Sequence, residues 1–374
     1  MSRAENAALR VLMVTPRYLP QIGGVERHVH EVATRLASGG TEVTVLTTDR
    51  EGGLPARERL DSVEVRRVPA HPRGRDWHFA PGVVGVIAHG RWDIVHVQSY
   101  HTFVAPLAMT AAAARRIPHV LTFHGGGHSD ALRHRGRGLQ RTLLRPLLAR
   151  AAGLVAVAEF EIEEYSRELR IPQERFALIP NGVELPRVPA ANGDEDAGHP
   201  LIASVGRLER YKGHQRVIAA LPHVLASAPS ARVWIAGSGP YEQQLRELAA
   251  ELGIAERVEI GAVAAGDRGE MARRLVASDV VVLLSDFETH PIAALEAISL
   301  GLPLLVASGS GLGELAQRGL ARSIDADATA ERVAEAILHE LRDPLVRSPV
   351  VLPTWDDCAA ALLDLYHRIL GGAP

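Results

Sequence analysis

The sequence predicts an α/β protein with two Rossmann-like domains, each built on a parallel sheet. Short apolar segments alternate with segments of helical periodicity along nearly the whole chain, which is the pattern of doubly wound sheets. The 374 residues exceed what one hydrophobic core usually holds. Residues 186–200 interrupt the alternation with polar residues, proline and glycine, and they are therefore the predicted linker.

These features predict the boundaries of three parts. The first domain is expected at residues 1–188 and the second at 199–352. A last helix, within 353–374, is expected to cross back to the first domain, because the Pro-rich segment 344–353 precedes it. We expect a cleft between the two domains.

The first half of the chain contains seven strand-like and four helix-like segments. The first predicted helix shows the periodicity most clearly: Val25, Val29, Val32 and Leu36 share one face, and Gly39 and Gly40 end it. The strands are expected at 9–15, 42–47, 63–68, 93–97, 120–124, 154–157 and 176–179, and the helices at 25–36, 103–116, 137–152 and 159–169.

The alternation resumes after the linker. The strands are expected at 201–205, 233–236, 258–260, 280–284 and 304–306. The helices are expected at 214–228, 241–252, from Pro291 to the stop at 301–303, at 312–318, at 328–342 and at 355–370. Proline suits a helix start because the first turn leaves its N–H groups unpaired.

Composition excludes several classes of function. A formal net charge of −3 gives no reason to expect a nucleic-acid partner. Cys358 is the only cysteine, so neither an internal disulfide nor a thiolate metal cluster can form, and a cytoplasmic location fits. The apolar segment 9–14 is too short for a signal peptide, and no apolar segment is long enough to span a bilayer.

The segment 206–213, GRLERYKG, lies between a predicted strand and a predicted helix. Arg207 and Lys212 beside a helix start suit a diphosphate, because arginine can bind two oxygens and lysine adds a compact charge. Lys212 is also the only lysine in the chain. The ordinary alternative is a solvated loop with a basic face.

Two carboxylates flank the next predicted strand–helix loop, Glu288 at its tip and Glu296 inside the helix, with seven residues between them. Ligands of parallel sheets bind beyond the carboxyl ends of the strands, where this loop lies. Carboxylates there accept hydrogen bonds from sugar hydroxyls, or they act as a glycosidase-like acid–base pair. Surface glutamates without a ligand are the alternative.

Two further features of the first half suggest ligand contact. Gly23 and Gly24 let the backbone approach a ligand before a helix, although the third glycine of a dinucleotide fingerprint is missing, so NAD is not supported. His124 follows a strand and precedes three glycines, where it is placed for proton transfer or hydrogen bonding. A tight turn and a core histidine are the respective alternatives.

The segment 133–150 carries a run of arginines. It could contact an anionic membrane surface or a phosphorylated acceptor. A solvated face of an amphipathic helix is favoured, because leucines account for the other face. The arginines are Arg133, Arg135, Arg137, Arg141, Arg145 and Arg150, and the leucines are Leu139, Leu143, Leu144 and Leu147.

Taken together in chain order, these motifs resemble the retaining glycosyltransferases of family 4, which have the GT-B fold. The resemblance extends from about residue 9 to residue 370. Each motif is weak alone, but six in the family's order are specific. They are residues 23–26 (GGVE), 122–125 (TFHG), 179–184 (IPNGVE), 206–213 (GRLERYKG), 236–240 (AGSGP) and 288–296 (ETHPIAALE).

The resemblance implies a role for residues of the second domain, which would bind the donor, a nucleoside diphosphate sugar. Arg207 and Lys212 would hold the diphosphate and stabilise the leaving group. Glu288 would contact the transferred sugar, and Glu296 the ribose hydroxyls. The backbone from His290 to Ile292 would help to bind the sugar or the phosphate. Neither a metal ion nor another cofactor is implied, because cations and helix dipoles supply the positive charge.

The same resemblance implies that the first domain binds the acceptor. His124 would contact the sugar near the reacting carbon, and Gly24 would lie against the diphosphate. Gly23 and Asn181 are assigned to substrate binding in the same way. Family usage favours a UDP donor, with GDP as an alternative. The expected acceptors are an antibiotic or other secondary-metabolite precursor, a cell-envelope glycan or lipid, or a small polyol.

The chain departs from the family pattern after Glu288. The family usually has glycine, an aromatic residue and glycine there, whereas this chain has Thr289, His290 and Pro291. Proline removes one backbone N–H, so the sugar pocket is expected to differ. Two other functions remain open on this architecture: a nucleotide-sugar epimerase or phosphorylase, and a sugar-nucleotide-binding protein without turnover.

Overall fold

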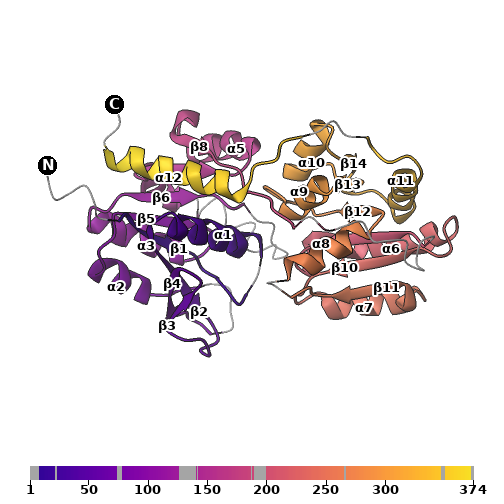
Figure 1. The fold of residues 1–374 in the computed structure, drawn as a ribbon, viewed down its shortest axis with the longest axis horizontal. Helices are drawn as coiled ribbons and strands as arrows, with labels where there is room; N and C mark the ends of the chain where they lie inside the picture. Colours follow the sequence, from indigo (N-terminus) through magenta and orange to yellow (C-terminus); the bar gives the residue numbers. More distant parts are fainter. Residues whose placement is uncertain are drawn as a thin grey trace. The chain divides into compact units, whose positions relative to one another are not determined.

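The computed structural model describes residues 8–21, 23–73, 78–125, 140, 142–186, 188, 199–264, 267–346 and 350–371. These residues form two compact units. The first contains the described residues up to 125, those between 140 and 182, and those from 353 onward, and the second contains those between 183 and 352. Each unit is an α/β structure with one sheet and helices packed on it (Figure 1).

The first unit contains an eight-stranded sheet in the order β3-β4-β2-β1-β5-β6-β7-β8. All neighbours are parallel except β3 and β4. The strands are β1 (Arg10–Val14), β2 (Glu42–Asp49), β3 (Arg57–Leu60), β4 (Val63–Pro69), β5 (Ile94–Gln98), β6 (His119–Thr122), β7 (Gly153–Ala156) and β8 (Phe176–Leu178).

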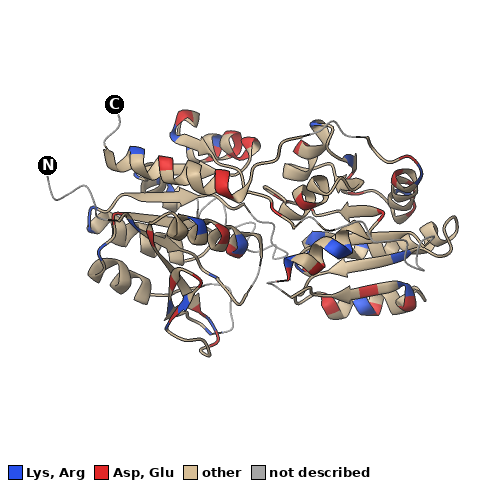
Figure 2. Ribbon diagram, viewed as in Figure 1, with Lys and Arg blue, Asp and Glu red and all other residues tan. Residues whose placement is uncertain are grey.

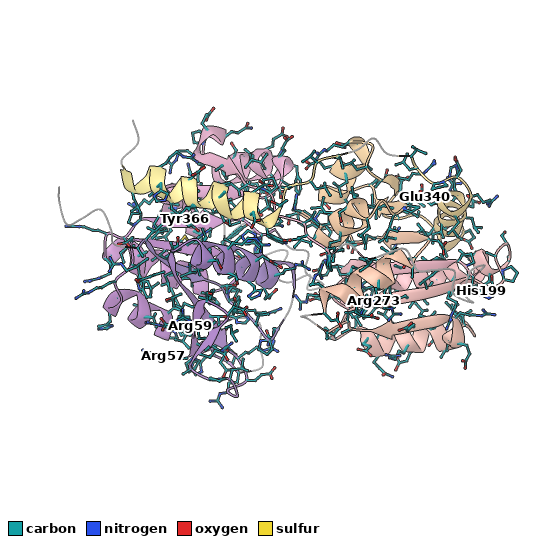
Figure 3. The ribbon with its side chains drawn as sticks, viewed as in Figure 1. Arg57, Arg59, His199, Arg273, Glu340 and Tyr366 are labelled. Atoms are coloured by element: carbon teal, nitrogen blue, oxygen red, sulfur yellow. The ribbon has the colours of Figure 1, made fainter. Side chains whose placement is uncertain are left out.

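Five labelled helices belong to this unit: α1 (Gly24–Ser38), α2 (Gly82–His89), α3 (Val104–Ala114), α5 (Glu159–Leu169) and α12 (Trp355–Gly371). Residues 142–149 are helical as well, and η1 (Gln173–Arg175) is a short 3-10 turn. The last helix, α12, packs beside α1 (yellow and dark indigo in Figure 1). Tyr366 anchors α12, because its hydroxyl lies 2.6 Å from Nδ1 of the buried His96 of β5 (Figure 3).

The second unit contains a six-stranded, entirely parallel sheet in the order β11-β10-β9-β12-β13-β14. Its strands are β9 (Leu201–Val205), β10 (Arg232–Ala236), β11 (Val258–Gly261), β12 (Val280–Leu283), β13 (Leu304–Ala307) and β14 (Arg322–Ile324). Its helices are α6 (His214–Leu225), α7 (Glu242–Glu251), α8 (Arg268–Val276), α9 (Ile292–Ser299), α10 (Ser310–Gln317) and α11 (Ala330–Arg342), with 3-10 turns η2 (Arg210–Lys212) and η3 (Ala255–Arg257).

Both faces of this second sheet are buried at β12 and β13, which explains why these two strands are continuous apolar segments in the sequence. Alternate residues of β12 point to opposite faces: Val280 and Val282 pack with α6, α7 and α11, whereas Val281 and Leu283 pack with α8, α9 and α10. The helices therefore cover the sheet in two layers, and the strand ends remain the place where loops can form a site.

Most of the predicted elements are present, with ends shifted by a few residues. Four elements were not predicted: β3, α2, α8 and β14. Two smaller expectations need correction. Strand β6 ends at Thr122 rather than at His124, and Pro291 is the N-cap of α9, in an extended conformation, rather than its first helical residue. Part of the predicted helix 137–152 lies outside the described residues.

Candidate functional site

The strand order of the second unit places a candidate site at the carboxyl ends of β9 and β12. The chain moves from β9 to β10 and β11 on one side, and from β12 to β13 and β14 on the other. These two neighbouring strands are therefore the topological switch point, beyond which open α/β sheets bind their ligands. Both acidic and basic sequence motifs follow these strands, 206–213 after β9 and 285–291 after β12.

Lys212 and Glu288 are brought together at this point. The Lys212 ammonium donates to Oε1 of Glu288, and the Ser285 hydroxyl donates to the same oxygen at 2.9 Å. Both side chains of the ion pair are mostly buried, with 16% and 20% of their area exposed. A lysine has three N–H donors, so the bond to Glu288 leaves two for a ligand.

The charge of Lys212 is secured by its surroundings. Burial lowers the pKa of Lys212, but the Glu288 carboxylate and Tyr211 more than offset this, so that the pKa lies above its ordinary value. The ammonium also lies 5.2 Å from the centre of the Tyr211 ring. The site therefore holds a charged, mostly buried ammonium, which is the type of charge that binds a phosphate strongly.

Arg207 lies in the same loop and is more exposed. Its guanidinium pairs with Glu209 at 2.7 Å, and 37% of its side chain is accessible. His214, the first residue of α6, supports the backbone of the Arg207 loop. Its Nδ1 lies 2.9 Å from the Ser204 hydroxyl, and its Nε2 lies 3.3 Å from the Arg207 carbonyl oxygen. Burial lowers the pKa of His214 to about 4, so this histidine is neutral at pH 7.

Glycines allow this loop to pack closely on its neighbours. Gly213 has φ of +77°, and a Cβ there would lie 2.1 Å from the Leu284 carbonyl oxygen. In the 236–240 turn, a Cβ on Gly237 or Gly239 would collide with the carbonyl oxygens of Gly206 and Leu208. The predicted glycine turn is thus a support for the Arg207 loop.

Two residues that the sequence did not single out hold the Glu288 loop. The Glu288 amide donates to the Ser310 hydroxyl at 2.9 Å, and the Gly311 amide donates to the Glu288 carbonyl oxygen at 2.8 Å. A Cβ on Gly311 would lie 1.9 Å from the Thr289 carbonyl oxygen. The start of α10 therefore fixes Glu288 and Thr289. In the sequence, the glycine-rich segment 309–313 was the feature that could have indicated these contacts.

Thr289, His290, Pro291 and Ile292 continue the loop into α9. Thr289 and Pro291 are buried, and the other two are partly exposed. Pro291 caps the helix without a side-chain hydrogen bond, and its carbonyl oxygen accepts from the amides of Ala294 and Leu295. The helix thus begins at Ile292, one residue later than predicted.

Glu296 lies one turn inside α9 and pairs with an arginine from another helix. Nη2 of Arg268, the first residue of α8, donates to Oε1 of Glu296. The carboxylate is almost fully buried, with 4% of its side chain exposed, whereas Arg268 is 28% exposed. Sequence reasoning missed Arg268 because α8 was not predicted and because 28 residues separate it from Glu296.

Two of the predicted residues of the first unit, Asn181 and His124, lie beside the buried His28. Gly23 is the N-cap of α1 and Gly24 its first residue. His28 of α1 lies 2.8 Å from Oδ1 of Asn181, and its ring meets that of His124 edge to face, with the ring centres 4.7 Å apart. The structure therefore brings Asn181 and His124 together through His28.

His124 is buried and is held by one amide. Its Nε2 lies 2.8 Å from Oε1 of Gln98, at the end of β5. Burial lowers the pKa of His124 well below its ordinary value, and the neighbouring histidines lower it further. The ring is therefore neutral near pH 7 and suits hydrogen bonding more than charge stabilisation.

The basic run is only partly described. Arg133, Arg135, Arg137 and Arg141 lie outside the described residues. Arg145 and Arg150 are exposed, while Leu144 and Leu148 are buried, as an amphipathic helix requires. No helix among the described residues is long and apolar enough to cross a membrane. In the same residues, no group of three or more histidine, cysteine, aspartate or glutamate side chains is arranged to hold a metal ion.

Comparison with known proteins identifies the class. Residues 22–187 match the model described as Glycosyltransferase Family 4, and residues 190–349 match that of Glycosyl transferases group 1. A glycogen synthase of Mycobacterium tuberculosis is 30% identical over 366 residues, covering 90% of this chain and 87% of the relative. These matches define a glycosyltransferase.

Solved structures agree on the fold. A sucrose-phosphate synthase from Thermosynechococcus elongatus superposes with a TM-score of 0.73 at 20% identity, covering 97% of this chain and 96% of the other. The Anabaena protein HepE, solved with UDP and glucose, gives 0.69 at 17% identity, covering 97% and 98%. The fold is therefore GT-B, as the sequence predicted. The chain belongs to glycosyltransferase family 4.

Proposed function

We propose that this glycosyltransferase moves a hexose-type sugar from a nucleoside diphosphate sugar, with UDP favoured, to a small-molecule, antibiotic-precursor or cell-envelope acceptor. The observation that carries the proposal is the mostly buried Lys212–Glu288 pair at the carboxyl ends of β9 and β12. The pair supports the proposal because a lysine suits a diphosphate and a carboxylate suits sugar hydroxyls.

Each residue of the second unit has a proposed role in donor binding. Arg207 and Lys212 bind the diphosphate, and their charge stabilises the leaving group as the glycosidic bond breaks. Glu288 accepts hydrogen bonds from the transferred sugar while it keeps Lys212 oriented. Glu296 accepts hydrogen bonds from the ribose hydroxyls. The sugar pocket is shaped by Thr289, His290, Pro291 and Ile292. The first backbone N–H groups of α9 point to the negative charge of the bound donor.

The proposed reaction retains the configuration of the anomeric carbon and proceeds by attack from the front face. The acceptor oxygen forms a bond to the anomeric carbon as the bond from that carbon to the diphosphate oxygen breaks. The proton of the acceptor hydroxyl passes to the departing diphosphate. This route needs no protein nucleophile. The first unit binds the acceptor, with His124 as a neutral hydrogen-bonding group.

A thermal-shift screen of UDP, GDP and their hexose derivatives tests the proposal, because a ligand of the native state raises the melting temperature by mass action. We expect one nucleoside diphosphate to stabilise the wild type and to lose this effect in Lys212→Ala. Arg210→Ala is the control, because Arg210 is an exposed cation on the same 3-10 turn.

The chemistry is tested with the nucleotide sugar that stabilises the protein most. Transfer to an acceptor in a panel of polyols, glycans, lipids and polyketide-type aglycones, with the linkage configuration read by NMR, supports the proposal. Epimerisation of the donor sugar without transfer would support the epimerase instead. No stabilisation by any nucleoside diphosphate would overturn the proposal.

A further inference from the structure

The pairing of Glu296 with Arg268 goes beyond the roles assigned above. Glu296 is nearly inaccessible to solvent, and a buried carboxylate is costly unless it is paired. The partner comes from a different helix: α8 and α9 both pack on the face of the sheet formed by Val281 and Leu283. Both helices begin at the carboxyl edge of that sheet, because each follows a strand of it.

The geometry leaves Arg268 with capacity for more than one partner. Nη2 is used by Glu296, while Nε is buried and has no hydrogen-bond partner among the residues that the structure describes. The rest of the side chain reaches solvent, with 28% exposed. An arginine presents five N–H donors in a planar fork, so it can orient one carboxylate and still donate elsewhere.

The start of α8 is itself held in place. Asp267 caps the helix, with its Oδ1 accepting from the Glu270 amide at 2.8 Å. Leu275 is buried in the same core as Leu295 of α9. Arg268 is thus fixed in position relative to Glu296, as is required of a side chain that sets the direction of another.

We propose that Arg268 is a positioning residue for recognition of the donor ribose. By holding Oε1 of Glu296, it fixes the plane of the carboxylate that is proposed to accept hydrogen bonds from the ribose hydroxyls. The inference rests on the proposed donor role of Glu296.

The test uses calorimetric titration with UDP and with 2′,3′-dideoxy-UDP, or with the guanosine pair if GDP is the better ligand. In the wild type, the two hydroxyls should raise affinity by about ten- to a hundredfold, as hydrogen bonds to a charged group do. In Arg268→Ala this preference should fall to a few-fold, while affinity for the dideoxy nucleotide stays nearly unchanged. Arg268→Lys should restore part of the preference.

Two further variants separate positioning from a structural effect. Arg273→Ala removes an arginine from the same helix, which carries charges of both signs (Figure 2). Arg273 is exposed (Figure 3). Among the described residues, it pairs only with Glu270. Its hydroxyl preference should equal that of the wild type. Adding Arg268→Ala to Glu296→Ala should change the preference no further, because the two residues act in series.

The outcomes are distinguishable. An equal loss of affinity for both nucleotides in Arg268→Ala, or a full hydroxyl preference in that variant, would refute the role of Arg268 while leaving the donor site in place. No binding of UDP or GDP by the wild type would refute the proposed function and this inference with it. Melting temperatures of all variants, measured without nucleotide, identify any that fail to fold, and Arg268→Lys then provides the decisive comparison.

Discussion

At the scale of single residues, Asn181 is a predicted substrate-binding residue that also makes a buried contact inside the first unit. It lies in the turn after β8, where family resemblance suggested substrate contact. In the structure it is buried, and its Oδ1 lies 2.8 Å from Nδ1 of His28. The next residue, Gly182, lies so close to Trp355 that a Cβ would be 2.2 Å from the Trp355 amide nitrogen. The turn therefore joins α1 to the start of α12.

We expect Asn181→Ala to destabilise the protein by about 1–3 kcal/mol, because it leaves a buried imidazole N–H without its acceptor. Chemical denaturation measures this loss. Nucleoside diphosphate affinity, measured by titration, should remain at the wild-type value. A stable variant with weakened nucleotide binding would instead make Asn181 a ligand-binding residue.

The residues of the proposed donor site differ in how far sequence could predict them. Lys212, Arg207 and Glu288 lie in the segments between a strand and the next helix, so the rule that ligands bind at strand ends applied to each of them. Arg268 and Ser310 could not be found in this way. Each acts by a contact with a residue more than 20 positions away in the chain, and only the packing of α8 and α10 brings those partners together.

At the scale of elements, α10 supports the loop that carries Glu288. Gly311 in its first turn packs against the Thr289 carbonyl oxygen so tightly that a methyl group cannot be accommodated without movement of backbone. At Gly309, the N-cap of the same helix, an added Cβ would have no neighbouring atom within 4 Å. Substitutions at Gly311 and Gly309 therefore form a matched test of whether α10 supports the loop that carries Glu288.

We predict that Gly311→Ala lowers the free energy of unfolding by about 1–3 kcal/mol, because overpacking displaces well-packed neighbours. It should also weaken binding of the nucleotide sugar more than that of the nucleoside diphosphate, since the displaced loop is the one proposed to contact the sugar. Gly309→Ala should change both quantities little. Equal behaviour of the two variants would show that α10 does not hold the loop.

The elements missed by sequence reasoning share a weak local signal. Helix α2, GVVGVIAH, is apolar on all sides and contains two glycines, so it lacks an amphipathic period. Helix α8 buries only Ala272 and Leu275, and β14 is three residues long. Elements with a buried stripe or a continuous β-branched segment, such as α1 and β12, were predicted because burial itself produces the pattern.

At the scale of the whole molecule, buried histidines couple stability to pH in both units. Burial lowers the pKa of His28 and of His214 to about 4, and that of His96 to about 3. The unfolded chain therefore binds more protons than the folded chain between these values and the ordinary value of 6.5. Their contribution to stability is present above pH 6.5 and is lost as the pH falls toward 4.

His214→Gln isolates one of these contributions. Between pH 7.5 and pH 5, the native histidine should cost about 2 kcal/mol of stability by linkage, and the variant should lose that much less over the same interval. Urea unfolding at the two pH values measures the difference. If His214→Gln kept the wild-type dependence of stability on pH, the assigned neutral state of His214 would be wrong.

The central claim is that the second unit binds a nucleoside diphosphate through Lys212 at the carboxyl ends of β9 and β12. Calorimetric titration of uridine, UMP and UDP, or of the guanosine series, into the wild type, Lys212→Ala and Arg210→Ala tests it most directly. We predict that the phosphates raise affinity in the wild type and in Arg210→Ala, and that most of this gain disappears in Lys212→Ala. An undiminished phosphate-dependent gain in Lys212→Ala would contradict the account.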